Sequence, residues 1–451
     1  MTEPNPEQAP GGVPTTGTTG VPTIGTTGVP GPTAAHGTSA AAGTAKDVAT
    51  LLVTISGDDR PGVTSAFFDA IADVGAEVRD LEQVVVRGHL TLAMLLAPGA
   101  GEDRLREVLT AVGRDLGLKV KLRSGTGDSL RQRKGRVAVV VLGSPLRASA
   151  VASVTARIAS HGANIDRIRR LARYPVTTVE FDVSGADVER LRRELALESS
   201  IHGIDISVAP GGLARRGRRL VVMDVDSTLI QDEVIELLAR HAGKEREVAE
   251  VTEAAMRGEL DFAESLRQRV AVLEGLPVSV LDDVRAAVRF TPGARTLVRT
   301  LKRLGFTVAV VSGGFLEVVE DLARELDIDH AHANRLEVRD GLLTGRVLGE
   351  IVDRQGKARA LRRFAEEAGL PLSRTVAIGD GANDLDMLET AGLGVAFNAK
   401  PVVREQADTS VTVPYLDAVL YLLGITREEI EEADAADGTP TPAPPIPQPG
   451  S

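Results

Sequence analysis

The chain has 451 residues, enough for two or three domains, and its 63 acidic and 52 basic residues give a formal net charge of -11. That charge argues against broad binding to the phosphate backbone of nucleic acids. The absence of cysteine excludes disulfides, thiolate nucleophiles and cysteine-based metal sites. No apolar run approaches the roughly 20 residues of a membrane span, and the N-terminus lacks the pattern of a signal peptide. We therefore expect a soluble cytoplasmic protein that binds neither nucleic acid nor membrane.

The two ends of the chain differ in composition from the rest. Residues 1–46 are rich in Pro, Gly, Thr and Ala and contain a short repeat, whereas residues 427–451 join an acidic run to a Pro-rich stretch. Segments of this kind cannot bury enough apolar surface to offset the entropy of ordering them. Both are predicted to be disordered tails.

An internal repeat follows the first tail. Residues 71–78 (Ile-Ala-Asp-Val-Gly-Ala-Glu-Val) align with residues 158–165 (Ile-Ala-Ser-His-Gly-Ala-Asn-Ile). Around each stretch the apolar periodicity predicts a strand, a helix, two strands, a second helix and a last strand. That order is the ferredoxin-like βαββαβ arrangement, predicted for 47–124 and again for 135–210.

Both copies resemble ACT domains, small modules that bind amino acids and regulate enzymes of amino-acid metabolism. The first copy has Gly-Asp-Asp-Arg-Pro-Gly at 57–62, a turn typical of that family, whereas the second departs from it with Gly-Ser-Pro-Leu-Arg-Ala-Ser at 143–149. The resemblance implies an amino-acid effector at the repeats. The alternative, equally open, is that the pair only forms a homodimer or packs on a catalytic domain.

After a basic linker at 215–219, an apolar run from Leu220 ends in two carboxylates, Asp224 and Asp226. A strand that is apolar at successive positions is covered on both faces, which indicates a parallel α/β sheet with its ligands at the carboxyl ends of the strands. Two neighbouring carboxylates suit a hard divalent cation such as Mg²⁺. An acidic turn that merely caps the next helix is the alternative.

Residues 232–288 show helical periodicity and interrupt the alternation of strands and helices. An insertion at the carboxyl end of the first strand can close over the site as a lid and exclude water. We expect a helical cap here.

Three further segments each carry a weak signal. Ser-Gly-Gly at 312–314 follows a strand and can open a helix whose N–H groups bind an anion, although such a sequence is more often just a tight turn. Lys357 lies near the start of a later helix, and a last apolar strand ends in Gly-Asp-Gly-Ala-Asn-Asp at 379–384. In a doubly wound sheet all of them meet Asp224 and Asp226 at one edge. They supply a carboxylate nucleophile, a second carboxylate for proton transfer, phosphate donors and cation ligands, which is a complete set for phosphoryl transfer.

From about residue 220 to 423 the chain resembles the haloacid-dehalogenase (HAD) superfamily, and within it the phosphoserine phosphatases. The segments at 224–228, 312–314, 357 and 379–384 cover all four superfamily motifs. The resemblance implies a HAD-like doubly wound parallel sheet with a helical cap over 215–426. It also implies Mg²⁺-dependent hydrolysis of O-phospho-L-serine through an aspartyl-phosphate, the last step of L-serine biosynthesis.

The same resemblance assigns roles to individual residues. Asp224 is the nucleophile and Asp226 the general acid and base; the Asp224 carboxylate, the Asp226 backbone carbonyl and Asp380 hold Mg²⁺, and Asp384 positions Lys357 or the metal waters. Met256 and Phe262 form an apolar wall of the lid. The substrate-binding residues it implies are Glu233, Arg269, Ser312, Gly313, Lys357 and Asn383.

Two of these assignments also make sense chemically. Phosphoserine carries an ammonium and a carboxylate, which Glu233 and Arg269 can meet with opposite charges. Two other functions stay open: a phosphatase of another small phosphorylated metabolite, and an amino-acid sensor with an inactive phosphatase domain. The intact set of motif residues argues against the sensor. A transporting ATPase is disfavoured because Asp226 offers a base for rapid hydrolysis and membrane spans are missing.

Overall fold

The computed structural model describes residues 48–127, 135–215, 217, 219–256, 261–439 and 441. The expected tail at 1–46 lies outside these ranges. The chain divides into two compact units, with the boundary between residues 131 and 132.

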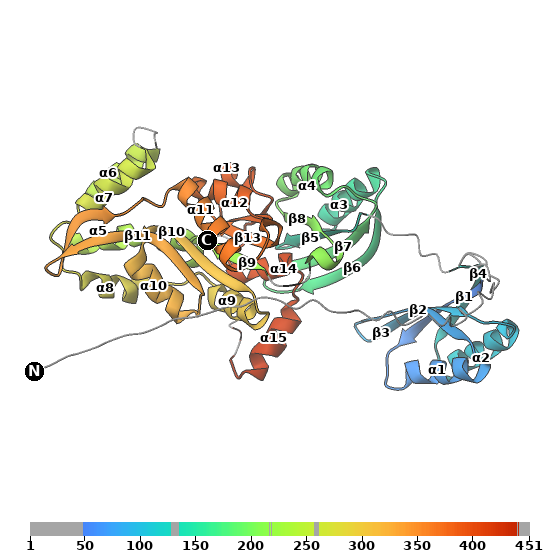
Figure 1. Cartoon of the computed structure of the whole chain (residues 1–451). Coiled ribbons are helices and arrows are strands. Elements are labelled where there is room, and N and C mark those ends of the chain that lie inside the picture. The colour runs from blue at the N-terminus through green and yellow to red at the C-terminus, as the bar shows by residue number, and fades with distance from the viewer. Residues whose placement is uncertain are drawn as a thin grey trace, which may run out of the picture. The chain divides into compact units, whose positions relative to one another are not determined.

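The first unit is one four-stranded antiparallel sheet with strand order β2-β3-β1-β4 and two helices (Figure 1). Leu51, Val53 and Ile55 alternate along β1 and pack beneath the helices in one apolar core. The helix α1 begins after Gly62, whose φ of 93° favours glycine. The elements are β1 (Ala49–Asp58), α1 (Val63–Val74), β2 (Glu77–Val86), β3 (His89–Ala97), α2 (Glu102–Asp115) and β4 (Lys119–Thr126).

The second unit starts with the same arrangement, so the predicted pair of βαββαβ domains is confirmed. Its sheet has the order β6-β7-β5-β8. The elements of this second copy are β5 (Val137–Gly143), α3 (Ala148–Ser160), β6 (Asn164–Ala172), β7 (Thr177–Ser184), α4 (Val188–His202) and β8 (Asp205–Pro210).

Both faces of this second sheet are covered. Val139 and Val141 on β5 pack under the domain's own helices, whereas Val140 and Leu142 belong to the core of the domain that follows. By contrast, Leu52 on β1, the corresponding strand of the first unit, is 40% exposed. The second copy therefore packs on the α/β domain that follows it, one of the arrangements that the sequence left open.

Polar contacts fix this packing. The buried Asp205 carboxylate accepts hydrogen bonds from Ser410 Oγ (2.7 Å) and from Thr412 N and Oγ1 (2.9 and 3.0 Å). Nearby, Arg192 forms an ion pair of 2.8 Å with Asp408. Residues from two domains thus satisfy one another's buried polar groups, as buried polar atoms require.

The catalytic domain is built on a seven-stranded sheet with the order β12-β11-β10-β9-β13-β14-β15. Only β12 of these strands pairs antiparallel with its neighbour, so the predicted doubly wound parallel sheet is confirmed. The central strand, β9, lies between β10 and β13, which are far from it in the sequence. The strands are β9 (Leu220–Met223), β10 (Thr307–Phe315), β11 (His330–Arg339), β12 (Leu342–Leu348), β13 (Thr375–Gly379), β14 (Leu393–Phe397) and β15 (Thr409–Val411).

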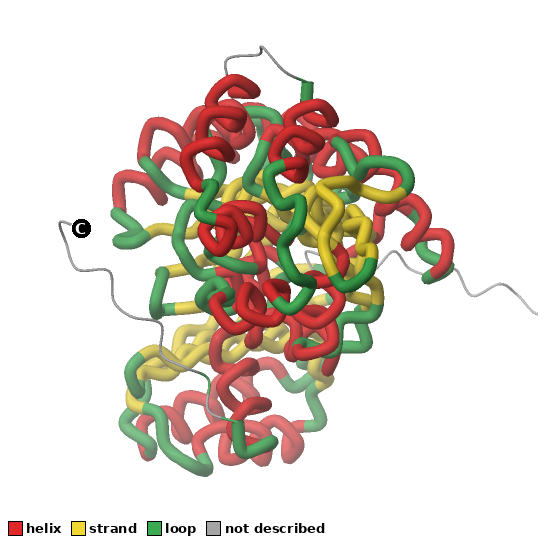
Figure 2. The backbone as a smooth tube through the Cα atoms, turned by 90° about the vertical axis from the view of Figure 1, so that its left-hand side faces the viewer, coloured by secondary structure: helices red, strands yellow, loops and turns green. Residues whose placement is uncertain are grey.

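Helices cover both faces of this sheet (Figure 2). Val221 and Met223 face one apolar core and Leu220 and Val222 the other, which explains why β9 reads as a continuous apolar run. None of the helices in the described ranges is long and apolar enough to cross a membrane. The longer helices of the sheet layers are α9 (Ala294–Arg303), α10 (Leu316–Glu325), α11 (Arg354–Glu367), α12 (Leu385–Thr390) and α15 (Arg427–Ala436).

A helical insertion follows β9, at the place where the sequence predicts a cap. It consists in the described residues of α5 (Val234–Ala242), α6 (Glu245–Met256), α7 (Phe262–Ala271) and α8 (Val280–Ala287). The insertion rejoins the sheet domain through a backbone bridge between Ile230 and Phe290.

The expectation of a disordered tail from residue 427 is wrong for residues 427–436, which form α15. This helix starts at a capping box made by Thr426 and Glu429, and Ile430 is buried against the main core. Asp434 accepts hydrogen bonds from Arg299 and Arg303 on α9. One buried apolar side chain and these ion pairs hold a segment whose composition alone suggests disorder.

Asp434→Asn should loosen α15 in a pH-dependent way. Burial alone would raise the pKa of Asp434, but its bonds to Arg299, Thr441 and Arg303 outweigh burial and lower the pKa to about 2. Because the unfolded pKa is about 3.9, the carboxylate contributes about 2 to 3 kcal/mol above pH 4, and this is lost as the pH falls toward 2. Calorimetry should therefore show a lower unfolding temperature for the variant at pH 7 and a smaller difference at pH 3.

The control is Asp437→Asn, since Asp437 bonds Arg303 with a side chain that is 59% exposed. Such a surface pair contributes roughly 0 to 1 kcal/mol, so this variant should stay close to the parent protein. An Asp434→Asn effect that is the same at pH 7 and pH 3 would rule out the ion pairs as its cause.

Candidate active site

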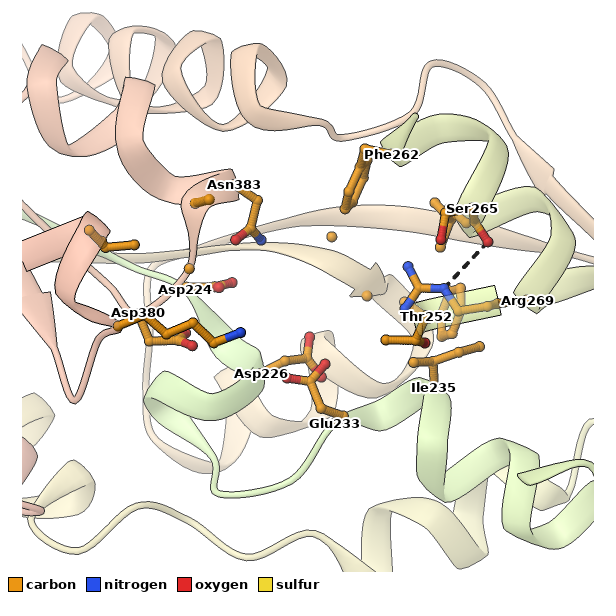
Figure 3. Close-up of a pocket in the computed structure, with 18 of the residues that line it drawn as sticks. Asp224, Asp226, Glu233, Ile235, Thr252, Phe262, Ser265, Arg269, Asp380 and Asn383 are labelled. Carbon is orange, nitrogen blue, oxygen red and sulfur yellow. Dashed lines mark hydrogen bonds between the residues drawn. The ribbon is translucent and has the colours of Figure 1, made fainter. Parts of the chain in front are cut away.

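A cavity of about 480 Å³ lies between the carboxyl ends of β9, β10 and β13 and the cap helices (Figure 3). Of the site residues expected from the sequence, eight line it: Asp224, Asp226, Glu233, Phe262, Arg269, Gly313, Asp380 and Asn383. Ser312 and Lys357 are completely buried just behind the wall and bond residues that line the cavity. The predicted site residues are therefore gathered in one place.

The end of β9 turns sharply to present both carboxylates. The backbone N–H of Asp224 donates to the Ile378 carbonyl at 2.9 Å, which ties the end of β9 to β13. The chain then enters an irregular turn over Val225–Leu229, where Ser227 has a φ of 58°. This turn brings Asp224 and Asp226 to the same cavity.

Lys357 provides the buried positive charge of the site. Its ammonium Nζ lies 2.8 Å from Asp224 Oδ1 and 2.6 Å from Asp384 Oδ1. Burial alone would lower the pKa of Lys357, but the two carboxylates outweigh burial and raise it. Asp384 also accepts a hydrogen bond from the Gly381 N–H at 3.0 Å. Of the two roles predicted for Asp384, to position Lys357 or the metal waters, the structure shows the contact with Lys357.

Carboxylates outnumber the cations at this end of the cavity. One oxygen each of Asp224, Asp380 and Asp384 lies within 4.8 Å of the others. Burial, and next the charge of Asp384, raise the pKa of Asp380 to about 6 and that of Asp224 well above its usual range. Thr228 Oγ1 donates to Asp380 Oδ1 at 3.0 Å and orients that side chain. Oxygen donors with uncompensated negative charge fit a divalent cation.

Asp226 is held by two donors from different segments. Ser312 Oγ donates to Asp226 Oδ2 at 2.9 Å, and the Val234 N–H at the start of the cap donates to Oδ1 at 2.8 Å. Burial raises the pKa of Asp226. A carboxyl group with a raised pKa is suited to give and take a proton near neutral pH.

The interpretation of Ser-Gly-Gly as the start of a helix is wrong. The strand β10 continues through these residues to Phe315, and α10 begins at Leu316. The bond from Gly314 N to Ser312 Oγ (2.7 Å) closes a tight turn instead. Backbone N–H groups can still face the cavity, but not as the first turn of a helix.

The cap places two opposite charges in the cavity, Glu233 beside Asp226 and Arg269 across from it (Figure 3). Glu233 Oε1 accepts a hydrogen bond from Ser227 Oγ at 2.8 Å, and burial, followed by the charge of Asp226, raises the pKa of Glu233 to about 7. Arg269 donates from Nε to the Ser265 carbonyl at 3.3 Å, shown dashed in Figure 3. Burial lowers the pKa of Arg269, although Glu233 and Asp226 oppose that shift.

Phe262 packs the cap against the segment that carries Gly313. Its Cζ would lie 3.0 Å from a Cβ placed on Gly313, so this position has little room for a side chain. The predicted partner of Phe262 in the apolar wall, Met256, ends α6, and its side chain lies outside the described part of the structure.

Sequence reasoning missed several residues that line the cavity. Ile235 and Thr252 carried no signal because their spacing is that of ordinary helix residues. Lys400 and Val402 follow β14, a strand that the sequence reading did not identify. The missed lining residues include Ile235, Thr252, Ser265, Lys400, Val402 and Val403.

Comparison with known families agrees with this architecture. Residues 221–389 match the haloacid dehalogenase-like hydrolases, and residues 49–123 and 136–209 each match an ACT domain. The chain is therefore a HAD-like hydrolase with two ACT domains, as its motifs predicted.

The most similar relatives include the phosphoserine phosphatase of Streptomyces coelicolor, 63% identical over 86% of this chain and 95% of that protein. The corresponding enzyme of Mycobacterium tuberculosis is 52% identical over 86% of this chain and 96% of that protein. A solved structure of a probable phosphoserine phosphatase from Vibrio cholerae, 36% identical, covers 66% of this chain and 88% of its own, with a TM-score of 0.53. The chain belongs to the phosphoserine phosphatase family, and the predicted resemblance is confirmed.

Proposed function

We propose that this protein hydrolyses O-phospho-L-serine to L-serine and phosphate through an aspartyl-phosphate at Asp224, the last step of L-serine biosynthesis. The observation that carries the proposal is the arrangement of one cavity. Asp224 pairs with the ammonium of Lys357 and shares the cavity with Asp226, Glu233 lies beside Asp226, and Arg269 faces them from the cap. These charges suit a small phosphate ester that also carries an ammonium and a carboxylate.

In the first half of the reaction, an Asp224 carboxylate oxygen attacks phosphorus and the bond from phosphorus to the serine oxygen breaks. Asp226 gives its proton to that oxygen, so that L-serine leaves as a neutral alcohol at its side chain. Lys357 neutralises charge on the phosphoryl oxygens, and Gly313 and Asn383 bind the same group by hydrogen bonds. The binding role predicted for Ser312 is indirect in this arrangement, because its hydroxyl donates to Asp226 Oδ2.

In the second half, Asp226 acts as a base. It takes a proton from a water molecule as the water oxygen attacks phosphorus, and the bond to the Asp224 oxygen breaks. Phosphate leaves and both carboxyl groups return to their starting states. A transporting ATPase would keep such an intermediate long enough for a conformational change, whereas Asp226 favours fast hydrolysis.

We propose Mg²⁺ as the cation of the site. The Asp224 carboxylate, the Asp226 backbone carbonyl and Asp380 would hold it, with Asp384 adding charge from beside Lys357. Bound Mg²⁺ supplies positive charge to the oxygens of the transferring phosphoryl group. Burial, and next the charge of Asp384, raise the pKa values of Asp224 and Asp380, and this close group of carboxylates supports the binding of a divalent ion here.

The remaining assignments belong to the same proposal. We place the ACT domains at 47–124 and 135–210 and the phosphatase domain at 215–426, with its cap at 232–288, and we propose a cytoplasmic location. A homodimer is the proposed assembly, which sedimentation velocity of the full chain would measure. The runner-up function is hydrolysis of another small phosphorylated metabolite, and turnover of a substrate panel with Mg²⁺ separates the two.

Asp224→Asn should abolish phosphoserine hydrolysis, because an amide is a poor nucleophile and a weaker cation ligand. Asp226→Asn should lower kcat/KM about 100 to 10,000-fold by removing proton transfer. The matched control is Asp386→Asn, which removes a carboxylate that bonds Arg354 outside the cavity and should leave the rate unchanged. Turnover by pure Asp224→Asn protein near the parent rate would remove Asp224 from the nucleophile's role.

Arg269→Ala should reduce turnover of phosphoserine far more than that of an aryl phosphate that lacks a carboxylate. A hydrogen bond to a charged group contributes about 1.5 to 3 kcal/mol, which is roughly a 10 to 150-fold difference in kcat/KM. Arg267→Ala on the same helix is the control, since its side chain is 59% exposed. Equal losses on both substrates would make Arg269 a purely structural residue.

L-Serine, or another small amino acid, should bind the first ACT domain and lower phosphatase activity without competing with the substrate. A coupling of about 1 to 3 kcal/mol would change affinity about 5 to 150-fold. Asp59→Ala, in the turn before α1, should weaken this inhibition, whereas Arg147→Ala, in the divergent turn of the second copy, should not. Inhibition that is wholly competitive and identical in both variants would mean simple product inhibition.

A further inference from the structure

Asn334 lies behind the cavity and forms hydrogen bonds with two backbone segments, one at Gly313 and one at Val352. It lies on β11 and is only 2% exposed. Its Nδ2 donates to the Gly313 carbonyl at 2.8 Å, and its Oδ1 accepts the Val352 N–H at 2.8 Å. Because one backbone partner is an acceptor and the other a donor, the orientation of the amide is fixed. No motif singles out this residue in the sequence.

The bond to Gly313 reaches the catalytic carboxylate through one rigid peptide group. The Gly313 carbonyl and the Gly314 N–H belong to the same planar peptide, so holding one orients the other. Gly314 N–H donates to Ser312 Oγ at 2.7 Å, and that hydroxyl donates to Asp226 Oδ2 at 2.9 Å. A continuous chain of hydrogen bonds thus leads from Asn334 to Asp226.

The peptide needs such an external hold. Glycine has the largest range of backbone conformations, and two glycines in succession would let this peptide rotate. Side chains that could restrict it do not fit, because a Cβ on Gly314 would lie 2.8 Å from Asp226 Oδ2. The restriction therefore has to come from a neighbouring strand, and Asn334 supplies it.

The other bond of Asn334 leads toward Lys357. Val352 precedes Asp353, whose side chain caps α11 by accepting the Gly356 N–H at 2.7 Å. Lys357 is the next residue of that helix. Asn334 thus fixes the loop carrying Ser312 and the start of the lysine helix relative to each other.

We propose that Asn334 is a positioning residue that orients the Gly313–Gly314 peptide and thereby keeps the Ser312 hydroxyl on Asp226. The proposal rests on the role proposed for Asp226. Loss of this hold lets the peptide rotate, and Asp226 then delivers its proton less effectively. The rate of the first half of the reaction then falls most for substrates whose leaving group needs that proton.

Asn334→Asp tests the proposal with almost no change in volume. The new group still accepts the Val352 N–H but presents an oxygen to the Gly313 carbonyl, so the hold on the peptide is lost. We compare kcat/KM for phenyl phosphate, a poor leaving group, with that for p-nitrophenyl phosphate, a good one. We expect kcat/KM to fall roughly 10 to 100-fold for phenyl phosphate, as is typical when a residue that orients a catalytic group is changed. The fall for p-nitrophenyl phosphate should be several-fold smaller.

Equal losses on the two esters, or none, would overturn the proposal. Asp434→Asn serves as control because it removes buried hydrogen bonds far from the site, so it should lower stability without changing the ratio of the two rates. If Asn334→Asp does not fold by circular dichroism, Asn334→Ser is measured in the same way. Aryl phosphates keep this test separate from the choice of natural substrate, which phosphoserine turnover by the parent protein decides.

Discussion

The buried ion pair of Lys357 with Asp224 and Asp384 is the interaction on which the site depends. An ammonium with no exposed surface is tolerated only when paired, and here it takes two carboxylates from two different strand ends. Each partner lies where the parallel sheet brings sequence-distant segments together: Asp224 after β9, Asp384 after β13 and Lys357 on α11. Loss of Lys357 would leave two buried carboxylates without their cation, so the same ion pairs determine the geometry of the nucleophile and the stability of this sheet edge.

Charge balance explains why the rest of the cavity is built as it is. One lysine cannot balance the four carboxylates Asp224, Asp226, Asp380 and Asp384. Burial raises the pKa of Asp224, Asp226 and Asp380, and the charge of Asp384 raises those of Asp224 and Asp380 further. A divalent cation at the sheet edge would restore the balance. The cap adds Glu233 beside Asp226 and Arg269 across the cavity, and Phe262 brings the cap against Gly313.

The sequence predicted the features that depend on short, local patterns. Apolar strands that end in Asp224 and Asp380 defined the sheet edge, and the repeat defined the paired βαββαβ domains. It could not predict features that arise from neighbours distant along the chain. Asn334 looks like an ordinary polar residue of a strand, yet the fold places it behind Gly313. The acidic composition after residue 426 suggested disorder, because the arginines on α9 that pair with Asp434 lie more than 100 positions earlier. Ser-Gly-Gly was considered as the start of a helix, but α10 begins only at Leu316, and the bond from Gly314 N to Ser312 Oγ holds the segment in a tight turn where β10 loses register with β11.

The sequence also could not predict how the two ACT domains differ in their packing. The repeat predicted two ACT domains of the same fold, but their sheets have different surroundings: β5 is buried on both faces, whereas its counterpart β1 leaves Leu52 40% exposed. The second copy is part of the phosphatase core, since Val140 and Leu142 belong to the same apolar cluster as Tyr421 and Leu422. A phosphatase fragment that began at Arg215 would expose this cluster and leave Ser410 and Thr412 without Asp205. Buried polar groups that lose their partners cost about 1 to 3 kcal/mol each. The smallest self-sufficient catalytic unit is thus expected to begin near residue 135, so that any regulation by the second copy cannot be separated from its structural role.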